Sequence, residues 1–98
     1  MLITQDEVQI QTAAEECVEN GIAFLDERIP WWRNDIDINS LWLGNDCDCV
    51  LGQTAGGYFQ AVLRFGLTLE KSDRLGFSAF ETDYGYMELT AAWKAALA

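Results

Sequence analysis

The stretch TQDEVQIQTAAEECVENGIAFLDE, residues 4–27, carries the longest helical pattern in the chain. Thr4 and Glu7 have the spacing of a capping box, in which each side chain accepts a hydrogen bond from the other's backbone amide. Beyond them, apolar residues recur every three or four positions, which predicts a helix over residues 5–27 that Pro30 ends. Its apolar face comprises Ile10, Ala13, Ala14, Cys17, Gly21, Phe24 and Leu25, and its acidic face comprises Glu15, Glu16, Glu19, Asp26 and Glu27.

Two residues of this apolar face carry specific expectations. Gly21 costs about 1 kcal/mol of helix propensity relative to alanine, so its presence indicates a close approach of another backbone. Cys17 lies at the centre of the face, and we expect its side chain to be buried.

The residues from Val50 to Phe65 predict a second helix. Asp46 or Asp48 is placed to cap its start. The pair of glycines at 56–57 weakens the helix and predicts a kink or a tight crossing there. The predicted buried face consists of Leu51, Ala55, Tyr58, Phe59, Val62 and Phe65.

Glycines and caps mark the remaining elements. Gly66 is placed to end the second helix in the left-handed conformation, and Thr68 to begin a short helix ending near Leu75. Gly76 is placed to end this short helix as Gly66 ends the second one. A C-terminal helix, capped by Thr82 or Asp83, would then pack through Tyr86, Leu89, Trp93, Ala96 and Leu97.

The segment between the first two helices, residues 28–49, has no sustained helical period. We interpret it as an irregular connector held by aromatic side chains. The chain as a whole, residues 1–98, is therefore expected to be a single, mainly α domain with three longer helices and one short one. The short alternations DIDI and LWL leave an alternative open, an α+β fold with a minor hairpin.

The net charge of −10 is unevenly distributed. Residues 1–49 carry eleven acidic and two basic residues, whereas residues 50–98 carry five and four. Such a field repels nucleic acid and anionic membrane, and it favours a partner protein with a basic surface. We therefore expect no direct binding to nucleic acid or to a membrane.

The N-terminal residues lack a signal-peptide pattern, and no apolar run reaches the length of a membrane span. Three cysteines are an odd number and too few for a disulfide scaffold. Both observations favour a cytoplasmic protein with free thiols.

Histidine is absent from the sequence, which removes the triads that combine it with serine or cysteine. The carboxylate pairs at 35 and 37 and at 46 and 48 lie in polar acidic runs where nothing raises the pKa of one partner. We therefore expect no enzymatic activity and no cofactor, although an unusual carboxylate site stays open.

The motif CDC at residues 47–49 raises three alternatives. Cys47, Asp48 and Cys49 are the candidates for a metal site, but the spacing is tighter than in usual zinc sites. A redox pair is a second alternative, with flanking carboxylates opposing a stabilised thiolate. We favour packing, with one cysteine against the start of the helix and the other partly exposed.

Trp31 and Trp32 follow Pro30 directly. Two adjacent rings in an irregular segment cannot both point the same way, which leaves room for one of them to lie near the surface. Exposed tryptophan beside Arg33 is typical of an interface anchor. General burial tendencies nevertheless favour the structural alternative, in which both rings cover the end of the first helix.

The pieces AFLDERIPWW, IDINSLWL, CDCVLGQTAGGYF and LTAAW, spread over residues 23–93, follow one another in a recognisable order. This pattern resembles a group of small proteins from actinobacteria and their phages, with CVLGQ as its most specific part. Trp31 stands where that group would have glycine, so the local turn differs. The resemblance implies a short intracellular protein of phage origin and assigns no catalytic residue.

Together these features predict a non-enzymatic phage or mobile-element accessory protein that binds a host or phage protein. The predicted protein-binding residues are Trp31, Trp32, Glu15, Glu19 and Asp26. Three alternatives stay open. The first is mimicry of nucleic acid that inhibits a DNA-binding protein, the second is a small metal or redox module at Cys47 and Cys49, and the third is assembly into a homo-oligomer.

Overall fold

A computed structural model describes residues 5–98, with side chains from Ala13 onward. The chain forms five α-helices and two 3₁₀ turns between those limits, and no strand. The elements are α1 (Gln5–Arg28), η1 (Trp32–Asp35), η2 (Ile38–Ser40), α2 (Val50–Thr54), α3 (Tyr58–Phe65), α4 (Leu69–Arg74) and α5 (Tyr86–Leu97). The mainly α expectation is thus confirmed, and the alternative with a hairpin is wrong for this part of the chain.

Two features of the first helix fall outside the described region. The predicted capping box needs Thr4 and the side chain of Glu7, and the side chain of Ile10 is likewise not described. No helix within residues 5–98 is long and apolar enough to cross a membrane.

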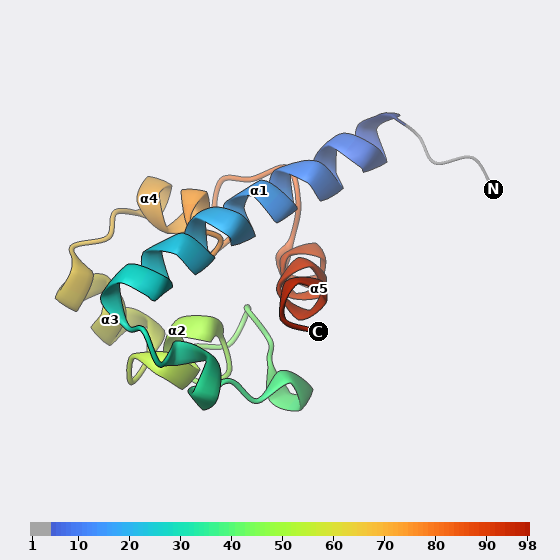
Figure 1. Ribbon diagram of the computed structural model, residues 1–98. Helices are drawn as coiled ribbons and strands as arrows, with labels where there is room; N and C mark the ends of the chain where they lie inside the picture. Colours follow the sequence, from blue (N-terminus) through green and yellow to red (C-terminus); the bar gives the residue numbers. More distant parts are fainter. Residues whose placement is uncertain (1–4) are drawn as a thin grey trace.

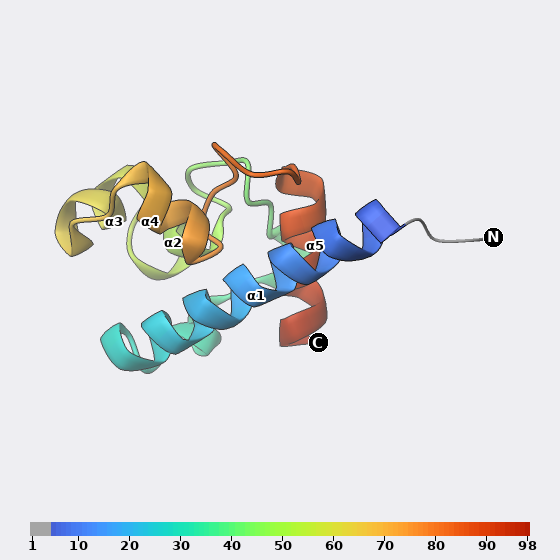
Figure 2. The ribbon, with the colours of Figure 1, turned by 90° about the horizontal axis from the view of Figure 1, so that it is seen from above.

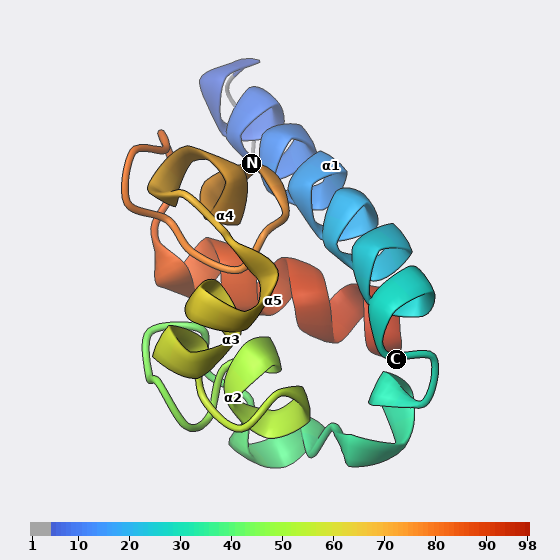
Figure 3. The same ribbon diagram turned by 90° about the vertical axis from the view of Figure 1, so that its left-hand side faces the viewer.

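The helices pack around a crossing of the first and the last. α1 contacts α5 and α4, while α2 contacts α3 and η1. Figure 1 shows α1 running across the molecule with α5 seen nearly end-on beneath it, and Figure 2 shows the two helices crossing, with α2, α3 and α4 grouped on one side of the crossing. In Figure 3 the connector that holds η1 and η2 closes the end of the molecule below α5.

Glycine permits the close contact between α1 and the turn after α4. A Cβ atom at Gly21 would lie only 2.1 Å from the carbonyl oxygen of Leu75. Gly76, at φ 71°, faces the backbone of Cys17 in the same way, where a Cβ would lie 2.9 Å from the carbonyl oxygen. The predicted backbone approach at Gly21 is therefore confirmed, because neither position has room for a side chain.

A row of aromatic rings joins five parts of the chain in the core. Neighbouring ring centres are 5.4 to 6.1 Å apart, and all but one of these pairs meet edge to face, a favourable arrangement. In spatial order the row consists of Trp32, Trp93, Phe77, Phe24 and Phe65.

The buried faces differ from expectation in a few places. On α1, Val18 is fully buried, whereas Cys17 is only partly buried, so the expectation of a buried Cys17 is wrong. On α5, Thr90 is buried because its hydroxyl oxygen accepts a hydrogen bond of 3.0 Å from the amide of Leu43, while Ala96 is exposed. A buried polar residue is compatible with a core when it has a hydrogen-bond partner. The spacing of apolar residues in the sequence does not predict such a residue.

The predicted helix over residues 50–65 is divided into α2 and α3. Gly56 and Gly57 have φ values of 83° and 137°, which are unfavourable for residues with a side chain. The predicted distortion is thus confirmed, but the continuous helix is wrong. Three longer helices are present, as expected, together with two short ones instead of one.

The caps of two helices also differ from expectation. Cys49, rather than Asp46 or Asp48, caps α2, and its Sγ accepts a hydrogen bond of 3.2 Å from the amide of Gly52. At the start of α5, Thr82 and Asp83 do not act as the cap. Gly85 takes this position, and its amide donates a hydrogen bond of 3.0 Å to Glu88 Oε2.

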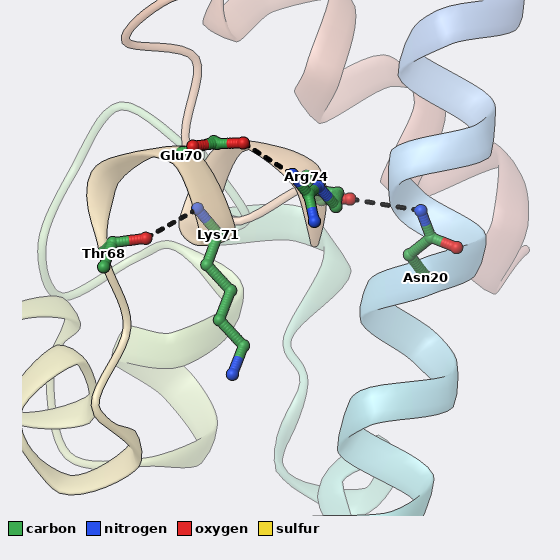
Figure 4. Close-up of polar contacts among 5 residues, drawn as sticks. All are labelled: Asn20, Thr68, Glu70, Lys71 and Arg74. Atoms are coloured by element: carbon green, nitrogen blue, oxygen red, sulfur yellow. Dashed lines mark hydrogen bonds and ion pairs between the residues drawn. The ribbon is translucent and has the colours of Figure 1, made fainter.

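The short helix α4 agrees with its sequence signals, and Figure 4 shows its contacts. Thr68 Oγ1 accepts a hydrogen bond of 3.1 Å from the amide of Lys71. Arg74 forms an ion pair with Glu70 one turn earlier, at 2.6 Å. The carbonyl oxygen of Arg74 accepts a hydrogen bond from Asn20 Nδ2 at 3.3 Å, which ties the end of α4 to α1.

Candidate functional site

The acidic face of α1 is exposed along the middle of the helix. Glu15, Glu16 and Glu19 all lie at the surface. Glu15 and Glu19 are one turn apart, about 6 Å along the helix axis. Neither of the two ion pairs found among the described residues involves them. Their charges are therefore not neutralised by the basic side chains of residues 13–98.

Asp26, the third predicted acidic contact, has an internal role. Its Oδ1 accepts hydrogen bonds from Trp32 Nε1 at 2.8 Å and from Arg33 Nη1 at 2.6 Å. The hydrogen bond from Trp32, followed by that from Arg33, holds the pKa of Asp26 below its usual value. Asp26 thus ties η1 to the end of α1, and its charge is largely committed within the chain.

The two adjacent tryptophans have opposite positions. Trp32 is fully buried, with its ring edge to face against Trp93 and the guanidinium of Arg33 4.5 Å from its ring centre. Trp31 is 60% exposed, so the favoured expectation that both rings are buried is wrong. Trp32 is therefore a core residue and not a surface anchor, whereas the ring of Trp31 is exposed to a partner.

The cysteine pair is also divided between core and surface. Cys49 is buried at the start of α2, and Cys47 is exposed. This confirms the packing interpretation of their positions. Burial raises the pKa of the Cys49 thiol, although the hydrogen bond from the Gly52 amide opposes the shift. Among the residues that the structure describes, no group of three or more His, Cys, Asp or Glu side chains is arranged to hold a metal ion.

A groove of about 270 Å³ lies beside the chain segment that leads into α2, and the sequence patterns did not predict it. It brings together the connector, the start of α3 and the segment before α5. Asn45 and Asp46 supply its polar rim. Aromatic and aliphatic side chains supply most of its wall, namely Leu43, Tyr58, Phe59, Phe77, Phe80 and Tyr86.

Hydrogen bonds fix the polar rim against the start of α3. The carbonyl oxygen of Asp46 accepts a hydrogen bond of 3.2 Å from the amide of Tyr58. Its Oδ1 accepts another, of 3.3 Å, from the amide of Phe59. Asn45 Oδ1 accepts hydrogen bonds from two amides of its own turn. The backbone of Asp46 is thus held by the amide of Tyr58 and its carboxylate by the amide of Phe59, both at the start of α3, where backbone amides have no partner within the helix.

A buried chain of hydrogen bonds positions Tyr58. Ser78 Oγ donates to Asp73 Oδ1 at 2.6 Å, Ser72 Oγ lies 2.8 Å from Ser78 Oγ, and Tyr58 Oη lies 2.8 Å from Ser72 Oγ. Each hydroxyl has one proton and the carboxylate only accepts, so every hydroxyl donates towards Asp73. Tyr58 therefore directs its hydroxyl into the protein while its ring lines the groove.

The groove has few groups suited to proton transfer. Asp46 is the carboxylate among its lining residues, and the proton of Tyr58 is already donated inward. The raised pKa of Cys49 favours the protonated thiol, which is a poor nucleophile. With its aromatic wall and one fixed carboxylate, the arrangement is suited to binding.

Sequence reasoning missed Phe59 and Phe80, which are 68% and 50% exposed. Phe59 was expected on the buried face of a continuous helix, and this expectation is wrong because the helix is interrupted at Gly57 and Phe59 lies in the separate helix α3. Phe80 lies in a segment without periodicity. The glycine pair was the one signal that could have indicated a different orientation for Phe59.

The chain matches no protein-family model, no curated protein and no solved structure. Any proposed function therefore has to be inferred from the residues and geometry of this chain. The features available for that purpose are the exposed acidic residues of α1, the exposed ring of Trp31, and the aromatic groove.

Proposed function

We propose that this protein is a non-enzymatic binding factor whose exposed acidic residues on α1, together with Trp31, dock on a basic surface of another protein. The observation that carries the proposal is the exposure of Glu15 and Glu19 without an ion-pair partner among the described residues. Trp31 follows the end of α1, where Asp26 forms hydrogen bonds with Trp32 and Arg33. The exposed ring of Trp31 supplies an apolar anchor, and the unpaired carboxylates of α1 supply electrostatic steering.

The proposed setting is the cytoplasm of an actinobacterial host, with the protein supplied by a phage or another mobile element. The resemblance of the sequence over residues 23–93 supports this setting. A partner with a basic surface is expected because the chain carries a net charge of −10.

Native mass spectrometry tests the proposal. The tagged protein is captured without chelator from cells of an actinobacterial host, beside a variant carrying Glu15→Lys and Glu19→Lys. We expect the natural chain to retain a host or phage protein with a basic surface, and the variant to lose it. A substitution Trp31→Ala should weaken retention without changing net charge.

A matched control keeps the change in charge constant. Glu81→Lys with Asp83→Lys alters net charge equally, but at exposed positions of the segment before α5. Circular dichroism must show that all variants fold. Equal loss of the partner from both charge variants would indicate nonspecific attraction, and retention by the α1 variant would contradict the proposal.

Mimicry of nucleic acid is a second candidate, favoured by carboxylates that repeat at one-turn spacing on α1. It requires the captured partner to be a DNA-binding protein. Addition of duplex DNA should then displace this protein from the partner. Conversely, this protein should displace DNA from the partner, and the variant with Glu15→Lys and Glu19→Lys should not. Simultaneous binding of DNA and this protein would exclude mimicry.

A further inference from the structure

The aromatic groove has a composition suited to a cation. Phe59 and Phe80 form partly exposed walls, and the ring of Tyr58 lies between them, at 5.4 Å from Phe59 and 6.3 Å from Phe80. Tyr86 completes the aromatic lining. Aromatic faces attract Lys and Arg groups that come within about 6 Å of the ring centre.

Within the described part of the chain, no Lys or Arg forms a cation–π contact with these rings. The cation–π contacts found among the described residues join Arg28 with Phe24, Arg33 with Trp32, and Arg64 with Phe65. All three aromatic partners lie outside the groove. The lining contains no Lys or Arg. The aromatic residues that line the groove therefore form no cation–π contact with the described cations of this chain.

Asp46 adds a negative charge at the mouth. Its Oδ1 is engaged by the amide of Phe59, while none of the hydrogen bonds found in the described region ends at its Oδ2. Because α3 fixes this carboxylate, binding would not need to order it first. The negative charge and the aromatic rings therefore favour the same kind of occupant.

The size and surroundings of the groove favour a side chain from a polypeptide. Its volume, about 270 Å³, falls below the ~300–1,000 Å³ typical of sites for drug-sized ligands. Leu63, 84% exposed, lies one turn beyond Phe59 on α3, and Met87, 72% exposed, follows Tyr86. Leu63 lies on the same helix face as Phe59, so a polypeptide whose side chain enters beside Phe59 would also contact Leu63, whereas a small cation would leave it in water.

We propose that this groove, walled by Tyr58, Phe59, Phe80 and Tyr86 with Asp46 at its mouth, receives an Arg or Lys side chain of the protein partner. This inference rests on the proposed function, because it names a second contact with the same basic partner. It assigns the specific recognition to the groove, while α1 supplies broader electrostatic attraction.

The test uses the full chain and two peptides that differ only in charge. Acetyl-Leu-Arg-Leu-Gly-amide is titrated against the ¹⁵N-labelled protein, beside the same peptide with citrulline, a neutral analogue of similar shape, in place of Arg. We expect amide shifts at Asp46, Phe59 and Tyr86. The Arg peptide should bind at least ~5-fold more tightly, as loss of an exposed cation–π contact together with a charge pair implies.

Variants then locate the recognition. Asp46→Asn retains an oxygen that can accept from the Phe59 amide, and it should weaken the Arg peptide at least ~3-fold. Phe80→Leu removes a ring but keeps an apolar side chain, and it should have a similar effect. Asp83→Asn is the matched control, since it removes an exposed carboxylate outside the lining and should change binding little.

Each contrary outcome overturns the inference. If the citrulline peptide binds as tightly as the Arg peptide, the groove recognises apolar surface rather than charge. If neither peptide shifts the amide resonances at millimolar concentration, the groove binds neither of them. Tetramethylammonium chloride binding at the same amides more tightly than the Arg peptide would indicate a small-cation site. In all these cases the α1 charge variant still tests the proposed function separately, because Glu15 and Glu19 lie outside the groove.

Discussion

The indole nitrogen of Trp93 donates a hydrogen bond of 2.6 Å to the carbonyl oxygen of Gly76. This contact joins the middle of α5 to the turn after α4, where Gly76 also faces α1. The Trp93 ring lies close to Gly21 as well, 2.9 Å from the position of a Cβ there. Three elements distant in sequence therefore meet at two glycines and one tryptophan.

Gly21→Ala should destabilise the protein. In an ordinary helix this change gains about 1 kcal/mol, but the added Cβ would lie 2.1 Å from the backbone oxygen of Leu75. Overpacking of this kind costs roughly 1–3 kcal/mol, so the net free energy of unfolding should fall. Urea unfolding followed by tryptophan fluorescence measures it.

Ala23→Gly on the exposed side of α1 is the control for Gly21→Ala. It should cost about 1 kcal/mol through helix propensity alone. If Gly21→Ala instead raises the free energy of unfolding, the close approach of Leu75 does not restrict the position.

Two Tyr→Phe substitutions should have different effects. Tyr58 donates to Ser72, so Tyr58→Phe leaves a buried acceptor without its donor and should cost about 0.5–1.5 kcal/mol. The hydroxyl of Tyr84 is buried without a hydrogen-bond partner among the described atoms. Tyr84→Phe should therefore be neutral or stabilising. Thermal and urea unfolding of the two variants measure the change in the free energy of unfolding. Equal losses of stability in both variants would contradict the hydrogen-bond chain from Tyr58 to Asp73.

Asp26 should contribute stability that is lost in acid. Its folded-state pKa is lowered by the hydrogen bonds from Trp32 and Arg33. A lowered pKa stabilises the fold above the unfolded-state value, near 3.9, and this contribution disappears as pH falls through the folded-state value. Asp26→Asn should therefore reduce stability at neutral pH, and the difference from the natural chain should shrink below about pH 4.

Urea unfolding at several pH values measures this linkage. Asp35→Asn, at an exposed residue of η1 with no ion pair found among the described residues, is the matched control. The difference between the two variants, rather than the total pH dependence, reports on Asp26. A difference that stays constant from pH 7 to pH 3 would contradict the assigned hydrogen bonds.

The two neighbouring thiols should differ in reactivity. Cys47 is exposed, whereas Cys49 is buried with a raised pKa. Iodoacetamide at pH 8 should therefore modify Cys47 first and Cys49 only after unfolding or local opening. Mass spectrometry of peptides at successive times follows both sites. Equal rates in the folded protein would show that Cys49 is not enclosed at the start of α2.

Replacement of Cys49 separates its capping role from its thiol chemistry. Cys49→Ala removes the acceptor for the Gly52 amide and should cost at least ~1 kcal/mol, the usual value of an N-cap. Cys49→Ser keeps an acceptor at the same position and should retain more stability than Cys49→Ala. The reverse order in urea unfolding would contradict the capping role.

The sequence by itself determined the positions at which most helices end, because those signals are local. Gly66 adopts the left-handed conformation at φ 65°, Gly76 does so at φ 71°, and Thr68 caps α4. Each of these depends on the conformation or hydrogen bonding of a few adjacent residues. The periodic apolar residues of α1 and α5 likewise predicted their existence, with errors at single residues such as Val18 and Thr90.

Only the tertiary structure decided which side chains reach the surface together. Burial of Trp32 rather than Trp31 depends on Trp93, more than sixty positions away, and on Asp26. The groove depends on three separate segments, and on the break at Gly57 that exposes Phe59. Local patterns cannot encode these outcomes, because burial is set by which distant elements pack against one another.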